Sequence, residues 1–365
     1  MKIGFVAEPY EEHNASGMGY VVMEFMKNLP LEEGDSLTVY SSKPVSRDFV
    51  KTPFENVLVP KNFFKKLWYF FRLQDEIDVL LFIAPLLPLI IPKRIKAVQI
   101  CQELGSQKTP VSGIRERSIA FLRDQILMPR SLARASAIVA ASYATKTDIH
   151  TYYAVPDEKV IVVYDGYQDL SIYERHAPVV DPSLKPFFYF AGKVKGRKNV
   201  HGIVSGFVRF KERVKSDVKL LIAGDYGGEY FQKMKKEIDE HALSNDIIFA
   251  GYTSGAQHYA YYKNALALVF PSFNEGFGMP PVEAMSLGLP VITSNLSSMA
   301  EVVADAGLLV DPYDVDDISR AMEKVYIDPA LREELIKKGY MRAKDFSWTK
   351  ASGEVMASLR EITAK

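Results

Sequence analysis

The chain has 365 residues, a formal net charge of zero, 48% apolar residues and 25% charged residues. This length favours two domains over one. The neutral charge argues against a protein that binds nucleic acid through a broad basic surface. The single cysteine, Cys101, excludes an intramolecular disulfide, gives no sign of a cysteine-based metal site, and fits a reducing compartment.

The first half alternates short apolar runs with longer amphipathic stretches, beginning with MKIGFVAEPY. That start lacks the apolar region and cleavage site of a signal peptide, so we expect a cytoplasmic protein. The run from 79 to 92 is too short and too rich in proline to span a bilayer, and it predicts a buried strand with its exit loop. Helices are expected at Tyr20–Leu29 and Ser118–Ala135. Strands are expected at Ile3–Ala7, Ser36–Tyr40, Val79–Ile83, Ala97–Cys101, Ala137–Ala140 and Val160–Val163.

A second series of the same kind follows a polar, turn-rich stretch at 165–185. Short buried strands joined by helices indicate parallel sheets. We therefore predict an α/β protein with two Rossmann-like domains, 1–170 and 171–348, that face each other across a ligand-binding cleft, with a last helix at 349–365 that packs back on the first domain. The second-series strands are expected at Phe187–Ala191, Val218–Ala223, Asp246–Ala250, Ala267–Val269, Val291–Thr293 and Leu308–Val310. Its helices are expected at Val200–Val214, Tyr230–His241, His258–Asn264 and Val282–Leu287.

The stretch FPSFNEGFGMPPVEAM, residues 270–285, combines two glycines, two prolines and two glutamates. We expect a strand to end at Phe270 and a helix to begin at the two prolines, because proline suits the first turn of a helix. Gly276 and Gly278 would let the loop present backbone N–H groups at that helix N-terminus, which is an anion site suited to a diphosphate. Glu275 would lie in the loop and Glu283 in the first helical turn, where the helix dipole alone could also explain it.

This stretch resembles the E-x7-E segment of the family four retaining glycosyltransferases, which have the glycosyltransferase B fold. The resemblance covers most of the chain, and its long central part is specific. It includes LLIAGDYGG (220–228), IIFAGYTS (247–254), the run 261–295, MAEVVADAGLLVDPYD (299–314), Phe346-Ser347-Trp348 and the run 136–169.

The resemblance implies roles for the residues of this loop. Glu275 would contact the transferred sugar, and Glu283 would bind the ribose hydroxyls. Gly276 and the amides of Phe277, Gly278 and Met279 would approach the donor. Two basic residues, Lys193 and Lys198, would bind the diphosphate. Lys193 departs mildly from the family, which often has arginine there, and the alternative for the whole basic run is a solvated loop.

Further positions follow from the same resemblance. Tyr252 would touch the nucleobase, or else be a surface aromatic residue. Gly17 and Gly19, just before a helix, would close on the donor, whereas His13 fits a polar loop position. Gln102 stands where many members have histidine, and glutamine cannot carry a proton. Gln102 therefore either only orients substrate or marks an altered activity.

The function implied is transfer of a hexose from a nucleotide diphosphate sugar to a glycan, lipid-linked or small-molecule acceptor, with retention at the anomeric carbon. Glu275, Lys193, Lys198 and Gln102 are the expected catalytic residues. We expect no metal and no cofactor beyond the donor itself, with front-side attack favoured over a covalent Glu275 intermediate. The alternatives are a nucleotide-sugar epimerase of the same fold and a non-catalytic nucleotide-sugar-binding or membrane-associated scaffold.

A basic and aromatic segment in the first half predicts where an acceptor or a membrane would be met. Residues 61–72 contain no acidic residue, and Lys and Arg recur at 93–96 and in the arginines at 115, 117, 123, 130 and 134. Such a face could lie on anionic lipid, which would place the protein peripherally on the inner face of the membrane. The alternative is a helix that buries its aromatic residues and solvates its cations.

Overall fold

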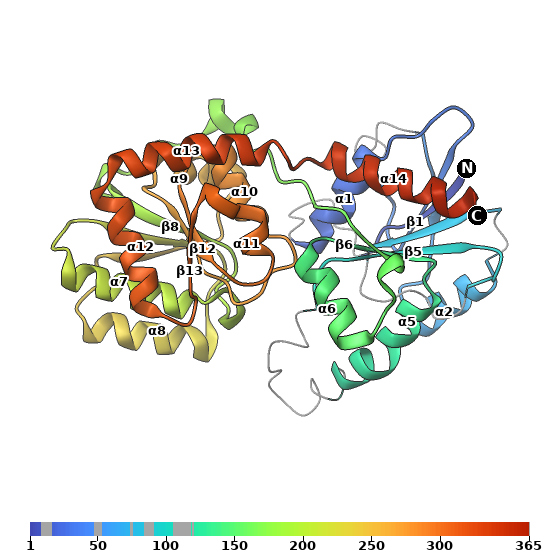
Figure 1. The fold of residues 1–365 in the computed structure, drawn as a ribbon, viewed down its shortest axis with the longest axis horizontal. Helices are drawn as coiled ribbons and strands as arrows, with labels where there is room; N and C mark the ends of the chain where they lie inside the picture. The colour runs from blue at the N-terminus through green and yellow to red at the C-terminus, as the bar shows by residue number, and fades with distance from the viewer. Residues whose placement is uncertain are drawn as a thin grey trace. The chain divides into compact units, whose positions relative to one another are not determined.

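The computed structural model describes residues 1–8, 17–46, 53–73, 76–83, 91–104, 118 and 120–364. The chain forms two compact units (Figure 1). The N-terminal unit comprises Met1–Gly166 together with Ser347–Lys365, and the C-terminal unit comprises Tyr167–Phe346. The chain first passes from one unit to the other after Gly166, close to the predicted boundary at 170, and it returns after Phe346.

The N-terminal unit has a seven-stranded parallel sheet in the order β3-β2-β1-β4-β5-β6-β7. Its central strands are buried along almost their whole length, as expected for a sheet covered on both faces. The strands are β1 (Lys2–Val6), β2 (Ser36–Ser41), β3 (Glu55–Leu58), β4 (Val79–Ile83), β5 (Lys96–Cys101), β6 (Ala137–Ala140) and β7 (Val160–Val162).

Helices of the N-terminal unit include α1 (Met18–Asn28), α2 (Phe63–Phe71), α5 (Met128–Arg134), α6 (Tyr143–Tyr153) and α14 (Trp348–Ala364). A π-helical segment at Leu122–Leu127 precedes α5 within the helix expected at 118–135. The last helix, α14, packs against α1 (Figure 1). A partly buried ion pair also ties α14 to this unit, because Nη2 of Arg360 lies 2.7 Å from Oδ2 of Asp35.

The C-terminal unit has a six-stranded parallel sheet in the order β10-β9-β8-β11-β12-β13. The order reverses between β8 and β11, and loops at the carboxyl ends of strands beside such a reversal form ligand sites in open α/β sheets. The strands are β8 (Phe187–Ala191), β9 (Lys219–Ala223), β10 (Ile247–Gly251), β11 (Leu268–Phe270), β12 (Val291–Ser294) and β13 (Leu308–Val310).

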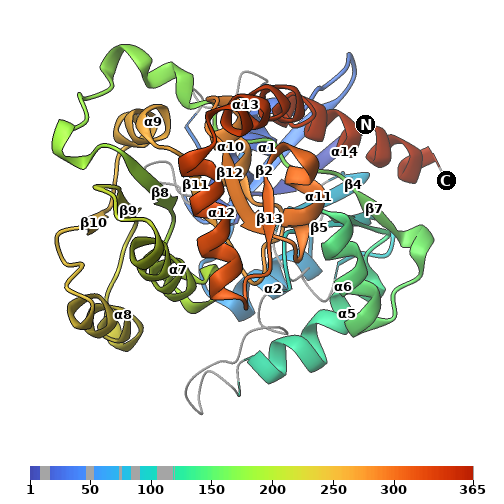
Figure 2. The same ribbon diagram turned by 60° about the vertical axis from the view of Figure 1, so that its left-hand side comes forward.

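Helices cover both faces of this second sheet. Figure 2 shows α7 and α12 side by side on one face, with α9 and α10 on the other. Short 3₁₀ segments lie at Asp157–Lys159, Leu170–His176, Pro182–Leu184, Gly196–Lys198 and Ala304–Ala306. The helices are α7 (Val200–Arg213), α8 (Gly228–Glu240), α9 (Gly255–Asn264), α10 (Met279–Ser286), α11 (Ser298–Val303), α12 (Val315–Ile327) and α13 (Pro329–Ala343).

The predicted fold class is confirmed, since every predicted strand is present with its ends shifted by at most a residue or so. The edge strand β3 was not predicted, because its sequence ENVL is polar and its residues are half-buried or exposed. Residues 84–90, in the expected exit loop of β4, lie outside the described part of the chain. Within the described residues, no helix has both the length and the apolar character that a bilayer crossing requires.

Candidate functional site

The loop between β11 and α10 has the predicted strand–loop–helix form. β11 ends at Phe270, and α10 begins at Met279 with Gly278 as its N-cap. Gly278 has φ +99°, and a Cβ there would lie 2.0 Å from Cε of Met299. This position therefore needs glycine chiefly for its backbone conformation, because the Met299 methyl is the far end of a flexible side chain.

The two prolines also limit what the start of α10 can donate. The first backbone amides of a helix have no partner within it, which is the basis of anion binding there. Pro280 and Pro281 carry no N–H, so the amides of Gly278 and Met279 are the ones that the helix start offers. A diphosphate would depend on these and on cationic side chains rather than on a full set of helix amides.

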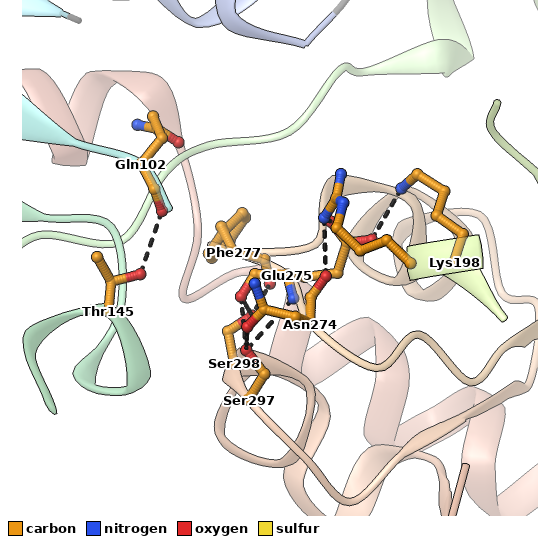
Figure 3. Close-up of polar contacts among 9 residues, drawn as sticks. Gln102, Thr145, Lys198, Asn274, Glu275, Phe277, Ser297 and Ser298 are labelled. Carbon is orange, nitrogen blue, oxygen red and sulfur yellow. Dashed lines mark hydrogen bonds and ion pairs between the residues drawn. The ribbon is translucent and has the colours of Figure 1, made fainter. Parts of the chain in front are cut away.

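Glu275 is held in this loop between two cations. Nζ of Lys198 lies 2.8 Å from its Oε1, and Nη1 of Arg197 lies 3.1 Å from its Oε2 (Figure 3). Burial alone would raise the pKa of the Glu275 carboxyl, but Lys198 and Arg197 outweigh burial and hold the pKa below its ordinary value. The carboxylate is therefore ionised and fixed at neutral pH.

The backbone around Glu275 is fixed by hydroxyl groups at the start of α11. The hydroxyls of Ser297 and Ser298 donate to the carbonyl of Glu275 at 2.7 and 3.0 Å, and Ser298 also donates to the carbonyl of Phe277 at 3.0 Å (Figure 3). Ser298 is fully buried. The loop thus has a defined shape before any ligand is bound.

The predicted pair of basic residues is brought together only in part. Lys198 lies over the ring of Phe270, 4.6 Å from its centroid, and points at Glu275. Lys193 is exposed, and within the described residues the two cations that pair with Glu275 are Lys198 and Arg197. Arg197 belongs to the basic run KVKGRK at 193–198, and the sequence indicated no role for it.

We predicted that Glu283 lies in the first turn of α10, and this prediction is wrong. The helix begins at Met279, so Glu283 is its fifth residue, and the helix dipole explains little of its presence. Its Oε2 accepts a hydrogen bond from the hydroxyl of Tyr262 at 3.1 Å. Burial raises the pKa of Glu283 to about 7, although the Tyr262 hydroxyl and the amide of Gln168 oppose the rise.

A second polar group close to Tyr262 was not predicted. His258 lies between two hydroxyls, with Nδ1 2.7 Å from Tyr189 and Nε2 2.7 Å from Thr253. Burial lowers the pKa of His258 to about 4, so the ring is neutral. The His258 and Tyr262 rings stack on each other, with centroids 6.2 Å apart, which places this neutral polar group one ring away from Glu283.

Tyr252, the expected nucleobase contact, lies just after β10 with 67% of its surface exposed. It is accessible to a ligand, and its role stays a prediction.

Gln102 follows β5, and its side chain is already engaged within the N-terminal unit. Its Nε2 donates to Oδ1 of Asp165 at 3.1 Å. Its backbone carbonyl accepts from the hydroxyl of Thr145 at 3.1 Å, as Figure 3 shows. Asp165 is buried, and burial raises the pKa of its carboxyl to about 7. Sequence reasoning missed Asp165, because it stands in a polar stretch that we interpreted as a linker.

The glycines of the first loop are only partly placed as expected. Gly17, with φ +58°, is the N-cap of α1, but Gly19 is the second residue of that helix and does not precede it. Residues 9–16, including His13, lie outside the described residues. In the part of the chain that is described, no three His, Cys, Asp or Glu side chains gather as a metal ion would require.

Several curated bacterial proteins are similar to this chain in sequence. The O-antigen chain mannosyltransferase B of Escherichia coli is 35% identical over 159 residues, which make up 44% of this chain and 42% of that protein. The serotype-specific mannosyltransferase WbdA of E. coli is 28% identical over 224 residues, 59% of this chain and 27% of that protein. The match thus spans less than half the length of either relative.

Solved structures resemble the chain over its full length. A sucrose-phosphate synthase from Thermosynechococcus elongatus superposes with a TM-score of 0.75 at 17% identity, covering 100% of this chain and 99% of that one. The Anabaena protein HepE, crystallised with UDP and glucose, superposes with a TM-score of 0.73 at 16% identity, covering 99% and 100%. At this identity the likeness shows the fold alone, and it supports the predicted glycosyltransferase B fold.

A family match covers most of the C-terminal unit. Residues 174–342 match the family described as glycosyl transferases group 1. The matched range runs from the first 3₁₀ segment of this unit almost to its end, and it includes Lys198, Glu275 and Glu283. The C-terminal unit is thus similar to the glycosyl transferases group 1 family over residues 174–342, in agreement with the resemblance that the sequence motifs indicated.

Proposed function

We propose that this protein transfers a hexose from a nucleoside diphosphate sugar to a glycan or lipid-linked acceptor, with retention at the anomeric carbon. The observation that carries the proposal is the buried Glu275 carboxylate between Lys198 and Arg197, in a glycine-dependent loop beside the start of α10. Cations and amides gathered at a strand end suit a departing diphosphate.

The chemical demand is to stabilise the leaving group. The bond between the anomeric carbon and the diphosphate oxygen breaks, and its electron pair goes to the diphosphate. The acceptor oxygen bonds to the same face of that carbon, and its proton passes to a phosphate oxygen of the leaving nucleoside diphosphate. Lys198, with Lys193 and the amide of Met279, would bind the negative charge that develops there.

Glu275 is better suited to position the sugar than to attack it. Both of its carboxylate oxygens are engaged by cations, and its pKa is depressed, which makes it a weak nucleophile and a weak base. A carboxylate so placed can still accept hydrogen bonds from sugar hydroxyls. We therefore favour front-side attack over a covalent Glu275 intermediate.

Mannose is the first candidate for the transferred sugar. The supporting observation is that the two E. coli relatives described above are named mannosyltransferases, and one of those names refers to O-antigen chains. A bacterial polysaccharide or its lipid-linked precursor would then be the acceptor. Glu283 with Tyr262 would receive the ribose hydroxyls, and Tyr252 would lie near the base.

We further propose that the reaction needs no metal ion and no additional cofactor, because lysine and arginine side chains can neutralise the diphosphate. The test is the initial rate of transfer in excess chelator against the rate with added Mg²⁺ or Mn²⁺. Equal rates are expected. A rate that collapses in chelator and recovers with one divalent ion would refute metal independence while leaving the transfer itself in place.

The whole proposal is tested by nucleotide binding followed by turnover. The purified protein would be screened by thermal shift with UDP, GDP and ADP, and then incubated with the mannose, glucose and other hexose donors of the nucleotide that binds. Release of nucleoside diphosphate that depends on an acceptor, with a product of retained anomeric configuration, is expected. Binding without consumption of any donor would indicate a scaffold, and conversion of the donor without an acceptor would indicate an epimerase.

We also propose that the protein acts at the cytoplasmic face of a membrane through α2 and residues 93–96. Trp68 and Phe71 of α2 are 55% and 46% exposed, and the guanidinium of Arg72 lies 4.5 Å above the Trp68 ring. Lys93 and Arg94 are also exposed. Aromatic residues beside cations suit an anionic interface.

Vesicle flotation tests this membrane contact. The protein should float with vesicles that contain about one third phosphatidylglycerol and should stay behind with pure phosphatidylcholine, because the attraction is electrostatic. Trp68→Ala with Phe71→Ala should abolish flotation, whereas Tyr313→Ala, which removes an exposed aromatic ring from the C-terminal unit, should not. Equal flotation of all three proteins would rule out α2 as the contact.

A further inference from the structure

Arg197 makes three contacts with the loop that carries Glu275. Its carbonyl accepts the N–H of Phe273 at 3.0 Å. Its Nη1 donates to the carbonyl of Asn274 at 2.7 Å and to Oε2 of Glu275 at 3.1 Å. One residue therefore holds three consecutive residues of the loop, two through their backbone and one through its side chain.

Glu275 is paired with two cations, although one would balance its charge. One buried carboxylate, with 9% of its side chain exposed, faces two cations, and each of its oxygens has one of them. A nucleoside diphosphate would compete with Glu275 for Lys198, because phosphate oxygens are strong acceptors for an ammonium group. If Lys198 were the sole partner, its departure would leave a buried unpaired carboxylate, which is strongly unfavourable.

We propose that Arg197 is a positioning residue that retains Glu275 when the donor diphosphate draws Lys198 away. This inference rests on the proposed function, and it assigns separate tasks to two neighbouring cations. Lys198 is a point charge on a flexible stem and can move to a phosphate. Arg197 is tied to the Asn274 carbonyl as well as to Glu275, so it stays with the loop.

Two consequences follow from this division of tasks. Neutralising Arg197 should weaken diphosphate binding although the guanidinium does not touch the ligand, because Lys198 would then be needed by Glu275. Lysine at 197 should restore part of the loss, since it supplies the charge but cannot reproduce the planar fork that holds carbonyl and carboxylate together.

The experiment is a double-mutant cycle read by calorimetric titration with UDP, GDP and ADP, using the nucleotide that binds the wild-type protein. Arg197→Gln and Arg197→Lys are made alone and with Glu275→Gln. Arg209→Gln, an exposed arginine on α7, is the matched control. Arg197→Gln should weaken binding about tenfold or more and Arg197→Lys by less, whereas in the Glu275→Gln background Arg197→Gln should change affinity by less than about twofold. Arg209→Gln should match the wild type.

The remaining outcomes each decide something. An equal loss from Arg197→Gln in both backgrounds would mean that Arg197 binds phosphate itself, and no loss in the wild-type background would remove its role; either result overturns the inference and leaves the proposed function standing. A wild-type protein that binds none of the three nucleotides would overturn both. If Arg197→Gln alone fails to fold, Glu275→Gln should restore folding, and failure to do so would make Arg197 a purely structural residue.

Discussion

Nε2 of Gln102 lies 3.1 Å from Oδ1 of Asp165, one residue before the chain leaves the N-terminal unit at Gly166. The amide stands where we expected the family to have histidine, and it supplies a neutral donor to a buried carboxyl group. Burial raises the pKa of that carboxyl to about 7. Gln102 therefore stabilises an acid in the interior and is not itself placed as a proton carrier.

This pair predicts a pH-dependent stability that Asp165→Asn removes. Between about pH 4 and pH 7 the folded protein holds a proton on Asp165 that the unfolded chain has lost, so stability falls as the pH rises through this window. The amide oxygen of the variant side chain can still accept from Gln102 without burying a charge. The substitution should raise the melting temperature little at pH 5 and by several degrees at pH 8. Each unit by which burial raises the Asp165 pKa corresponds to about 1.4 kcal/mol of unfolding free energy.

The matched control for that experiment is Glu158→Gln, which neutralises an exposed carboxylate of the same unit. It should leave the melting temperature within about one degree at both pH values. A gain from Asp165→Asn that does not depend on pH would contradict the proton linkage.

Lys198→Ala should weaken binding of a nucleoside diphosphate far more than binding of the free nucleoside. The ammonium group would form charged hydrogen bonds with the diphosphate, each about 1.5–3 kcal/mol, or roughly 10- to 100-fold in affinity. Calorimetry with the two ligands measures the difference. An equal loss for both would remove Lys198 from the phosphate role.

Glu275→Gln should abolish transfer while sparing or tightening nucleoside diphosphate binding. The variant keeps the shape of the side chain but releases Lys198 from its ion pair, so the lysine is more available to the diphosphate. We expect a fall in kcat of about 100- to 1,000-fold. Near-wild-type turnover would count heavily against the site, and weaker nucleotide binding would contradict the competition for Lys198.

Much of this site follows from residue patterns alone. The strand that ends at Phe270, the glycine at 278 and the helix start at the prolines are local features, and each is present within a residue of where the sequence places it. Strand ends, helix starts and the need for a glycine depend on residues that are close in sequence. Residue patterns and the resemblance to a family can therefore predict them.

What the sequence could not supply are contacts between distant segments. Arg197 and Glu275 are 78 residues apart, and Gln102 and Asp165 are 63 apart. Nothing local distinguishes Arg197 from the other cations of its loop, or Asp165 from a solvated turn residue. The shift of Glu283 out of the first turn has a smaller cause, since the helix begins before the prolines, at Met279.

Donor affinity should rise with pH around neutrality because of Glu283. Only its ionised form can accept from both ribose hydroxyls, and its pKa is raised to about 7 by burial. Affinity for the nucleoside diphosphate should increase about tenfold from pH 6 to pH 8 in the wild type. Glu283→Gln should bind more weakly at pH 8 and show a flat profile, and a variant that keeps the wild-type slope would assign the pH dependence to another group.

Gly278→Ala tests whether the loop conformation itself matters. Alanine would have to adopt φ +99°, and its Cβ would displace the terminal methyl of Met299, so backbone strain is the main cost. We expect a loss of about 1–3 kcal/mol in unfolding free energy and a larger loss of diphosphate affinity. The control is Gly353→Ala in α14, where a Cβ meets nothing within 4 Å and helix propensity favours alanine by about 1 kcal/mol. If Gly278→Ala left stability and nucleotide affinity unchanged, the backbone conformation at Gly278 would not determine the shape of the loop.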